Sequence, residues 1–455
     1  MSRRSSFKQD LRRIVPLAWP VFIGQIAVLA FATVDTFLLA RFSAIDLAAL
    51  AVGMAVYISV FIGLMGVVLA VSPIVGRLFG AGQLEEAGRQ MHQAVWLAIL
   101  LSVLGDALLF FPAPLLSIAH AGPEVESRVR DYLLALAFAL PPALVFTVFR
   151  GFSTAISRPK TVMKLQVAGL LVKIPLSALL VWGAGPIPAL GTLGCGIATA
   201  IVMWVQCGAG LWLLKHDAAY DAFGLRSRRG LDAPHWKDIR ALLRLGVPMG
   251  ASIAVEVTGF AFMAIFIARL GPIPVAGHEL AMNLCSMMFM MPMAIGSAAG
   301  TLVAQAIGAR DHEGARRVSN HSMELGLIVA AVMGALVFVF REPVLRLYTH
   351  DMRIVNAAMP LLLWLWIFHT ADAVQTVAAQ ILRAYHVATA PVVIYALAIW
   401  GVGIGGGYHL AFSDSPSVPD SLRGAPGFWS ATTVGLVVAA IGLTAFMRWM
   451  HRQER

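Results

Sequence analysis

The sequence is poor in charged residues and has no polar block of domain size. Only 13% of its 455 residues are Asp, Glu, Lys or Arg, whereas 59% are hydrophobic, compared with about 45–50% in soluble domains. The mean hydropathy is +0.79. Despite a net charge of +10, this composition argues against a soluble enzyme or a nucleic-acid-binding domain and predicts a protein embedded in the lipid bilayer.

Cysteine is scarce, and the motifs of several enzyme classes are missing. Cys195, Cys207 and Cys285 lie in apolar stretches without CxxC spacing, which argues against a disulfide framework or a zinc site. GxxxxGKS, GxxxxGKT, HExxH and GxSxG do not occur, and the GxGxxG match from Gly401 to Gly406 lies within an apolar stretch. We interpret that match as helix packing or a bend, because no strand precedes it. We expect no enzyme activity and no cofactor, with energy supplied by an ion gradient.

Twelve apolar stretches are long enough to cross a bilayer as helices, which takes about 20 residues each. They run continuously apolar instead of alternating with the period of two that outer-membrane barrel strands require. The sequence therefore predicts an all-α polytopic membrane protein with twelve transmembrane helices. We place these helices at residues 14–40, 47–76, 93–115, 132–156, 162–184, 190–214, 242–268, 276–306, 320–340, 354–385, 389–410 and 429–450.

The chain contains an internal duplication. A shift that pairs Pro20 with Pro248 and Phe61 with Phe289 aligns about 70 residues without a gap. Six helices lie between equivalent points, so the two halves share one orientation and are related by a pseudo-twofold axis along the membrane normal. Two such lobes around a cavity are typical of a transporter, although a fold alone does not establish a function. The predicted parts are an N-terminal tail (1–13), an N-lobe (14–214), a cytoplasmic linker (215–241), a C-lobe (242–450) and a C-terminal tail (451–455).

Positive charge is concentrated on one side of the predicted membrane. With the N-terminus in the cytoplasm, 23 of the 34 lysines and arginines fall in cytoplasmic segments or at their edges, and 8 fall in outer segments. By the positive-inside rule, both termini and the linker face the cytoplasm. We expect a multi-pass protein of the cell inner membrane.

Few ionisable side chains lie deep in the predicted spans. A charge at the bilayer centre costs about 2.5–3.5 kcal/mol, so a functional role is the first hypothesis for each. Asp35, Glu256 and Asp372 are the candidate cation- or proton-binding acids. The alternative for each is a carboxylate capped by hydroxyl groups or a structural salt bridge. Three other acids lie in or near spans, and their roles stay open: Asp106, Glu279 and Glu324. The apolar surroundings of Asp106 favour a structural role for that residue.

Two of the predicted helices have a distinctive face. The helical period brings Phe368, His369, Asp372 and Gln375 onto one polar face of the span 354–385. Methionines are frequent in the span 276–306, and their adaptable side chains suit either a surface that binds many apolar shapes or ordinary packing. These methionines are Met287, Met288, Met290, Met291 and Met293.

The sequence resembles the NorM-like branch of the MATE (multidrug and toxic compound extrusion) family over nearly its whole length. The resemblance rests on PVFIGQ, VDTFLLARFSAIDLAALAVG, PIVGRLFGAGQ, PALGTLGCGIATAIVMW, AGHELAMNLCSMMFMMP and DAVQTVAAQILRAYHVATAP. It implies an antiporter that exports cationic amphiphilic compounds in exchange for H⁺ or Na⁺ by alternating access. By motif, Asp35 resembles the N-lobe carboxylate, and Glu256 with Asp372 resembles the C-lobe cation site, where Na⁺ would bind. Candidate substrate-cavity residues are Gln25, Ser177, Asn283, Met287, Phe368, His369 and Gln375.

Three departures from the family pattern bear on the coupling ion. Phe368 stands where a tyrosine is usual, four residues before Asp372. Lys173 and Ser177 replace asparagines, and Glu279 stands where glutamine is common. Because Na⁺ needs several oxygen ligands and a proton needs only one carboxylate, the departures favour H⁺.

Two contacts between distant residues are predicted. An isolated buried ammonium is unfavourable, so Lys173 is expected to have a partner. The resemblance implies that the spans 14–40 and 162–184 share the N-lobe cavity, which makes Asp35 the expected partner in an ion pair. The alternative is that Lys173 extends toward a membrane interface. Glu256 and Asp372 are expected to approach each other, since a pair of buried acids can share a cation or a proton.

Two other functions stay open. A lipid-linked saccharide flippase of the same superfamily would need a basic cavity for pyrophosphate, whereas acids outnumber bases in these spans. A non-transporting membrane scaffold or intramembrane enzyme is disfavoured by the duplication and the dispersed acids. The expected partners are small cationic molecules and the bilayer, without nucleic acid, and we expect a monomer.

Overall fold

The computed structural model describes residues 3–113, 122–225, 230–413, 416 and 418–453. Within these ranges, twelve helices are long and apolar enough to cross a membrane, so the predicted number of spans is confirmed. The chain divides into two compact units. We call them the N-unit, Trp19–Gly250, and the C-unit, which combines Met1–Ala18 with Ala251–Arg455.

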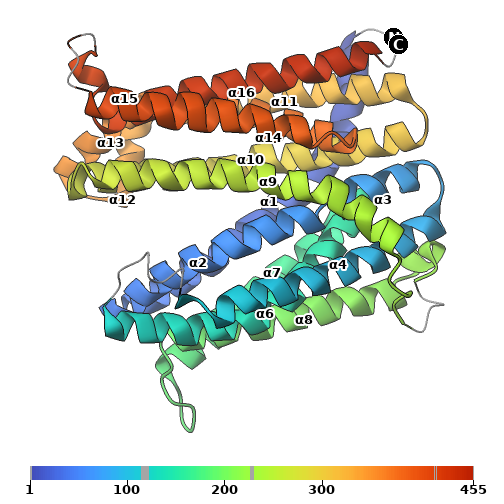
Figure 1. Cartoon of the computed structure of the whole chain (residues 1–455), viewed down its shortest axis with the longest axis horizontal. Coiled ribbons are helices and arrows are strands. Elements are labelled where there is room, and N and C mark those ends of the chain that lie inside the picture. Colours follow the sequence, from blue (N-terminus) through green and yellow to red (C-terminus); the bar gives the residue numbers. More distant parts are fainter. Residues whose placement is uncertain (1–2, 114–121, 226–229, 414–415, 417, 454–455) are drawn as a thin grey trace. The chain divides into compact units, whose positions relative to one another are not determined.

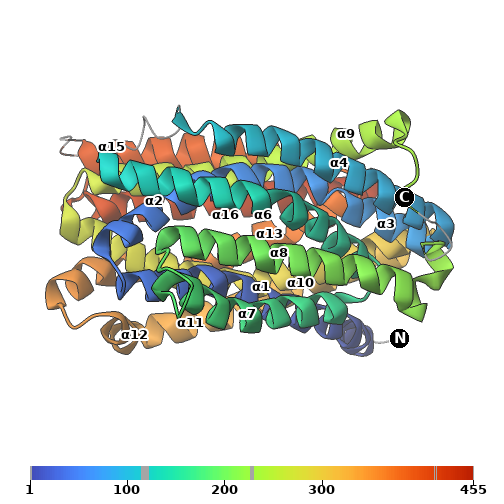
Figure 2. The same cartoon turned by 90° about the horizontal axis from the view of Figure 1, so that it is seen from below.

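The helices of each unit lie alongside one another (Figures 1 and 2). The N-unit contains α2 (Ala44–Val68), α3 (Val71–Gly80), α4 (Leu84–Phe110), α6 (Pro123–Ala155), α7 (Pro159–Trp182), α8 (Thr192–His216) and η1 (Ala218–Phe223). The C-unit contains α10 (Pro272–Gly308), α11 (His312–Val339), α12 (Arg341–Tyr348), α13 (Met352–Ala384), α14 (Thr389–Tyr395), η2 (Ala396–Gly405), α15 (Gly406–Phe412), η3 (Asp420–Leu422) and α16 (Ala425–Gln453). The unit boundary falls inside the two remaining helices, α1 (Arg3–Ala40) and α9 (Trp236–Ala268). Within the C-unit, the first turns of α1 and the last turns of α16 lie at the same end (Figures 1 and 2).

Several helices begin before the apolar stretches that predict them. α4 begins at Leu84 instead of 93, and α6 begins at Pro123 instead of 132. Their first turns carry charged side chains, which a search for apolar stretches excludes. Ion pairs between neighbouring turns stabilise such segments, as between Arg89 and Glu86 at 2.8 Å. The helices therefore extend beyond the part that is apolar enough to face lipid.

Prolines and glycines interrupt three of the predicted spans. α4 ends at Phe110, shortly before Pro112, instead of continuing to 115. The span predicted at 47–76 is broken between α2 and α3, where Pro73 in the first turn of α3 cannot donate a helical hydrogen bond. The glycine-rich segment 401–406 lies mostly in η2, a π-helical segment. A Cβ atom at Gly403 would lie 3.3 Å from Thr432 Cα of α16, so this glycine packs closely on a neighbouring helix, as the helix-packing interpretation expects.

Part of the predicted linker is attached to α4. The Gln93 side chain donates to the Ala233 carbonyl (3.0 Å) and accepts from the His235 amide (2.7 Å). The Trp96 indole donates to the Asp232 carbonyl (2.8 Å). Residues 232–235 are therefore fixed on the N-unit.

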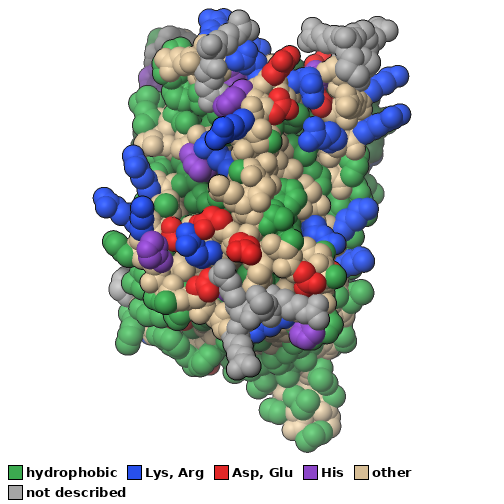
Figure 3. All heavy atoms as spheres, turned by 90° about the vertical axis from the view of Figure 1, so that its right-hand side faces the viewer, with side chains coloured by type: hydrophobic (Ala, Val, Ile, Leu, Met, Phe, Trp, Pro, Cys, Tyr) green, Lys and Arg blue, Asp and Glu red, His purple; other side chains and the backbone are tan. Residues whose placement is uncertain are grey.

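Apolar side chains cover the flanks of the helices, and charged side chains gather at helix ends. Leu171, Trp204 and Leu397 are 65%, 56% and 68% exposed, which is unfavourable in water but suits contact with lipid. Figure 3 looks onto helix ends, where Lys, Arg, Asp, Glu and His side chains gather, while hydrophobic side chains lie along the sides. This distribution matches helices that cross a bilayer and meet water at their ends.

Candidate functional sites: two buried carboxylate clusters

The N-unit contains a buried ion pair between α1 and α7. Lys173 Nζ lies 2.9 Å from Asp35 Oδ1 and donates to Oδ2 at 3.0 Å. Ser177, one turn after Lys173 on α7, donates its hydroxyl to Asp35 Oδ1 at 3.2 Å. The three residues are 0–3% exposed. The predicted ion pair is therefore present, and the alternative in which Lys173 extends to an interface is wrong.

Helix α8 supplies the other acceptors of the Lys173 ammonium. Nζ donates to the Cys195 carbonyl at 3.1 Å and to the Thr199 hydroxyl at 2.7 Å. An ammonium has three N–H donors, and Asp35, Cys195 and Thr199 together provide an acceptor for each. A buried ion pair is favourable only when its remaining polar atoms are also hydrogen-bonded. This condition is met here on both sides of the pair.

The arrangement restricts what Asp35 can bind. Lys173 contacts both carboxylate oxygens, and Ser177 contacts one of them. A cation that uses Asp35 as a ligand must therefore displace the ammonium from the carboxylate. The Cys195 carbonyl and the Thr199 hydroxyl would still accept hydrogen bonds from Lys173 after that displacement.

The C-unit brings Glu256 of α9 and Asp372 of α13 to one amide group. Gln375 Nε2 donates to Glu256 Oε1 at 2.7 Å and to Asp372 Oδ1 at 2.8 Å. The hydroxyl of Tyr395, on α14, donates to Gln375 Oε1. This contact orients the amide, because it places the oxygen toward Tyr395 and the nitrogen toward the two acids. The predicted approach of Glu256 and Asp372 is thus present, with Gln375 between them.

A buried arginine lies near this cluster. Arg383 of α13 is 8% exposed and donates to the Ser252 hydroxyl at 3.3 Å. Ser252 precedes Glu256 by one turn of α9, and the guanidinium interacts electrostatically with Glu256. Sequence reasoning missed Arg383 because it lies at the end of the predicted span 354–385, where an arginine can reach water. It also missed Tyr395, whose hydroxyl points to Gln375 only because of tertiary packing.

Phe368 lies among aromatic side chains. Its ring lies 5.2 Å from Trp429 and 6.0 Å from Phe260, centroid to centroid. Trp429 also donates to His278 Nδ1 at 3.2 Å. The neighbouring His369 is 1% exposed, and its Nε2 has no hydrogen-bond partner among the described residues.

The other candidate residues lie outside the two carboxylate clusters. Asn283 and Met287 are exposed on α10 and accept from the Tyr348 hydroxyl at 3.1 and 3.7 Å. Gln25 is half-buried on α1. Asp106 Oδ1 is buried and has no hydrogen-bond partner in the described part of the chain. The remaining acids are Glu279, which is exposed, and Glu324, which is half-buried.

The C-unit cluster holds several side-chain oxygens. They belong to the carboxylates of Glu256 and Asp372, to the Thr376 hydroxyl, which accepts from Gln375 at 3.2 Å, and to Gln375 Oε1 with the Tyr395 hydroxyl. Among the described residues, no group of three or more His, Cys, Asp or Glu side chains is arranged to hold a metal ion.

Comparison with known proteins identifies the family. The MatE family model matches residues 20–179 and again residues 248–409. The chain belongs to the MATE family. The two matches begin at equivalent positions of the internal repeat, so the duplication is confirmed. MATE proteins are membrane transporters and not enzymes, which agrees with the absence of hydrolase motifs from the sequence.

Curated relatives of this MATE chain extend over nearly its full length. The probable multidrug resistance protein NorM of Aromatoleum aromaticum is 40% identical over 450 residues, covering 97% of this chain and 95% of the relative. The multidrug resistance protein NorM of Vibrio cholerae is 34% identical and covers 98% and 97%. Both printed names agree with the predicted NorM-like branch.

Solved MATE structures have the same fold. The crystal structure of the eukaryotic MATE transporter AtDTX14 aligns with a TM-score of 0.87 at 19% identity and covers 98% of each chain. The Vibrio cholerae MATE transporter VcmN in the bent form aligns with a TM-score of 0.84 at 17% identity, covering 99% of each chain. At these identities the likeness shows the fold alone.

Proposed function

We propose that this MATE protein is a secondary antiporter that exports cationic amphiphilic compounds in exchange for protons by alternating access. Relatives that match nearly the whole chain are named multidrug resistance proteins. Those names favour drug export over the flipping of lipid-linked saccharides. Buried carboxylates in a membrane protein mark ion and substrate pathways, and each unit of this chain has such a cluster.

The observation that carries the proposal is the bridge between Glu256 and Asp372. Two acids share one neutral donor, the Gln375 amide, and the buried Arg383 guanidinium acts electrostatically on Glu256 alone of the two. Two carboxylates this close repel each other when both are ionised, so the pair favours the uptake of a proton or an organic cation. Because both would bind to the same negative charge, they compete, which is the basis of exchange.

The N-unit supports protons over Na⁺ as the coupling ion. The Lys173 ammonium already forms an ion pair with the Asp35 carboxylate, and the Ser177 hydroxyl donates a hydrogen bond to one of the same oxygens. A Na⁺ ion at Asp35 would have to replace that ammonium and find further oxygen ligands. In the C-unit, Phe368 offers no oxygen and is packed against Trp429. A proton needs only a carboxylate oxygen and is therefore the simpler coupling ion.

The proposal also covers the membrane, the topology and the oligomeric state of the protein. We infer that the protein lies in the cell inner membrane with both termini in the cytoplasm, because positive residues are concentrated in the segments on that side. The duplicated six-helix halves support alternating access. We infer that each chain works as a monomer, since each carboxylate cluster is complete within one unit of one chain.

Expression in an efflux-deficient bacterial host tests the proposed function. Cells that make the protein should accumulate less ethidium than cells that make the Asp372→Asn variant at equal membrane levels. A proton uncoupler should remove the difference. Unchanged accumulation across a panel of cationic dyes would refute export of organic cations, and an effect that survives the uncoupler would refute proton coupling.

A further inference from the structure

Helix α8 begins without a cap of its own. The residue before it, Gly191, has no side chain to accept from the first amides and adopts φ +55°, a conformation that favours glycine. The first turns of α8 also contain Gly194 and Gly196, and glycine lowers helix stability by about 1 kcal/mol relative to alanine. This end of α8 therefore depends on contacts from other helices.

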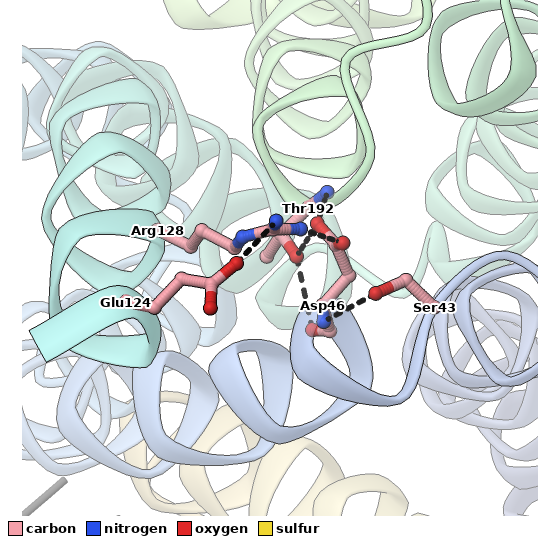
Figure 4. Close-up of polar contacts among 5 residues, drawn as sticks. All are labelled: Ser43, Asp46, Glu124, Arg128 and Thr192. Atoms are coloured by element: carbon pink, nitrogen blue, oxygen red, sulfur yellow. Dashed lines mark hydrogen bonds and ion pairs between the residues drawn. The ribbon is translucent and has the colours of Figure 1, made fainter. Parts of the chain in front are cut away.

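Asp46 of α2 supplies the missing cap (Figure 4). Its Oδ1 accepts from the Thr192 amide at 3.0 Å and from the Thr192 hydroxyl at 2.8 Å. The Thr192 hydroxyl lies 2.9 Å from the Asp46 carbonyl oxygen as well. A carboxylate at a helix N-terminus also interacts favourably with the helix dipole. Asp46 thus holds the first residue of α8 from a different helix.

The capping carboxylate is itself fixed. Asp46 is 2% exposed, and its Oδ2 accepts from the Arg128 guanidinium of α6. Arg128 also pairs with Glu124 at 3.2 Å (Figure 4). A Cβ atom at Gly191 would lie 2.4 Å from Asp46 Oδ1, so only glycine allows this close approach. Through Asp46, the cap therefore links α2 to both α6 and α8 and holds the carboxylate in a single orientation.

The capped turn leads directly to the acceptors of Lys173. Cys195 and Thr199 follow Thr192 by one turn and two turns of α8, and both accept from the Lys173 ammonium. Thr199 also donates to the Cys195 carbonyl at 2.9 Å. Any loosening of the first turn of α8 would therefore shift one or both acceptors away from the ammonium.

We propose that Asp46 is a positioning residue for the Lys173–Asp35 ion pair. By capping α8, it holds the Cys195 carbonyl and the Thr199 hydroxyl in place, so that Lys173 keeps two acceptors when Asp35 takes up a proton or an organic cation. The use of the ion pair in transport rests on the proposed function. The link from Asp46 through α8 to Lys173 does not, and it is measurable without transport.

Cysteine labelling along α8 tests the first part of this link. Single-cysteine proteins that keep only Cys195 or only Cys207 report on two places of the same helix, both buried. In proteoliposomes, Asp46→Ala should raise the rate at which N-ethylmaleimide modifies Cys195 by about 2-fold to 30-fold, the range expected for loss of a helix cap. The rate at Cys207 should stay at the wild-type value. Equal rates in variant and wild type, or a parallel rise at both cysteines, would overturn the proposal.

Thr192 offers a matched pair of variants for the same assay. Thr192→Val removes the hydroxyl contacts to Asp46 while keeping the side-chain shape, and it should accelerate labelling of Cys195. Thr192→Ser keeps the hydroxyl, so N-ethylmaleimide should modify Cys195 in this variant at the wild-type rate. If Asp46→Ala does not fold, this pair decides the outcome, and equal labelling of the valine and serine variants would contradict the proposal.

A double-mutant cycle tests the second part, the link to Lys173. The lowering of Tm caused by Lys173→Gln should be smaller in the Asp46→Ala background, because the acceptors are already displaced. Sites without shared partners give additive effects. The control is Asp311→Ala, which removes the cap that Asp311 gives to α11 in the C-unit (2.8 Å) and should be additive with Lys173→Gln. Additive effects of Asp46→Ala and Lys173→Gln would refute the positioning role, and Thr192→Val replaces Asp46→Ala if the latter does not fold. Neither readout involves transport, so failure here and failure of the proposed function are separate results.

Discussion

Lys173 and Asp35 form an ion pair of 2.9 Å inside the N-unit, with 0% of the lysine side chain exposed. A buried charge left without its partner costs about 3–5 kcal/mol. The pair therefore has to be kept closed, or opened only when another positive charge reaches the carboxylate. Lys173 therefore competes with any other positive charge for the Asp35 carboxylate.

The strength of this pair is measurable with a double-mutant cycle. Asp35→Asn and Lys173→Gln should each lower the free energy of unfolding, and the double variant should lose less than the sum of the two. The coupling expected for residues in contact is about 0.5–3 kcal/mol. Denaturant or thermal unfolding in one detergent gives the four values. A coupling near zero would show that the two side chains act independently.

Loss of a single acid in the C-unit should stop transport without preventing folding. Asp372→Asn keeps the size of the side chain and an oxygen that can accept from Gln375, but it removes the charge that a proton or an organic cation needs. Transport should fall to background while the amount of protein in the membrane stays close to wild type. Asp351→Asn is a matched control, because Asp351 caps the same helix, α13, at its exposed start. Wild-type efflux from Asp372→Asn would show that this acid is structural.

The Tyr395 hydroxyl should matter for the bridge between the two acids. Tyr395→Phe removes only the hydroxyl that donates to Gln375 Oε1, leaving the amide free to turn. The variant should lose about 1 kcal/mol of unfolding free energy, together with a clear decrease in the transport rate. Thermal unfolding and dye efflux measured on the same preparation check both effects. Efflux and stability equal to wild type would mean that the hydroxyl does not orient the amide.

The membrane orientation predicts which engineered cysteines react from outside. In a background without the three native cysteines, Lys237→Cys lies on the predicted cytoplasmic side, whereas Ala189→Cys lies in the loop between α7 and α8, on the predicted outer side. A membrane-impermeant maleimide added to intact cells should label Ala189→Cys alone. Labelling should reach both sites after the cells are opened. Labelling of Lys237→Cys in intact cells would reverse the orientation. The more direct position Ser227, in the same predicted linker, lies outside the described residues.

The sequence was sufficient for the helices and for the charged pair. Long apolar stretches determine how many helices cross the membrane, because each unsatisfied backbone group in lipid is costly. A charged side chain in lipid is also costly, so one lysine in an apolar helix is a strong signal, and the resemblance to the MATE family indicated Asp35 as its partner. The internal duplication was also visible in the sequence, because one shift that pairs Pro20 with Pro248 aligns the two halves.

Other features depend on packing between residues that are distant in the chain. The cap that Asp46 gives to Thr192 joins residues 146 positions apart, and no local pattern around either residue predicts it. Gln375 was expected on the same face as Asp372, but its position between Asp372 and Glu256 depends on how α9 and α13 pack. The start of α4 was missed because its charged first turn is helical without being apolar.

The central claim is that proton uptake drives the export of organic cations, and reconstitution tests it most directly. Purified protein in proteoliposomes is given a pH gradient without a Na⁺ gradient, or a Na⁺ gradient without a pH gradient, and the efflux of a cationic dye is followed. Asp372→Asn vesicles made at the same protein density provide the background. The account predicts efflux with the pH gradient and background efflux with the Na⁺ gradient. Efflux driven by Na⁺ alone would contradict it.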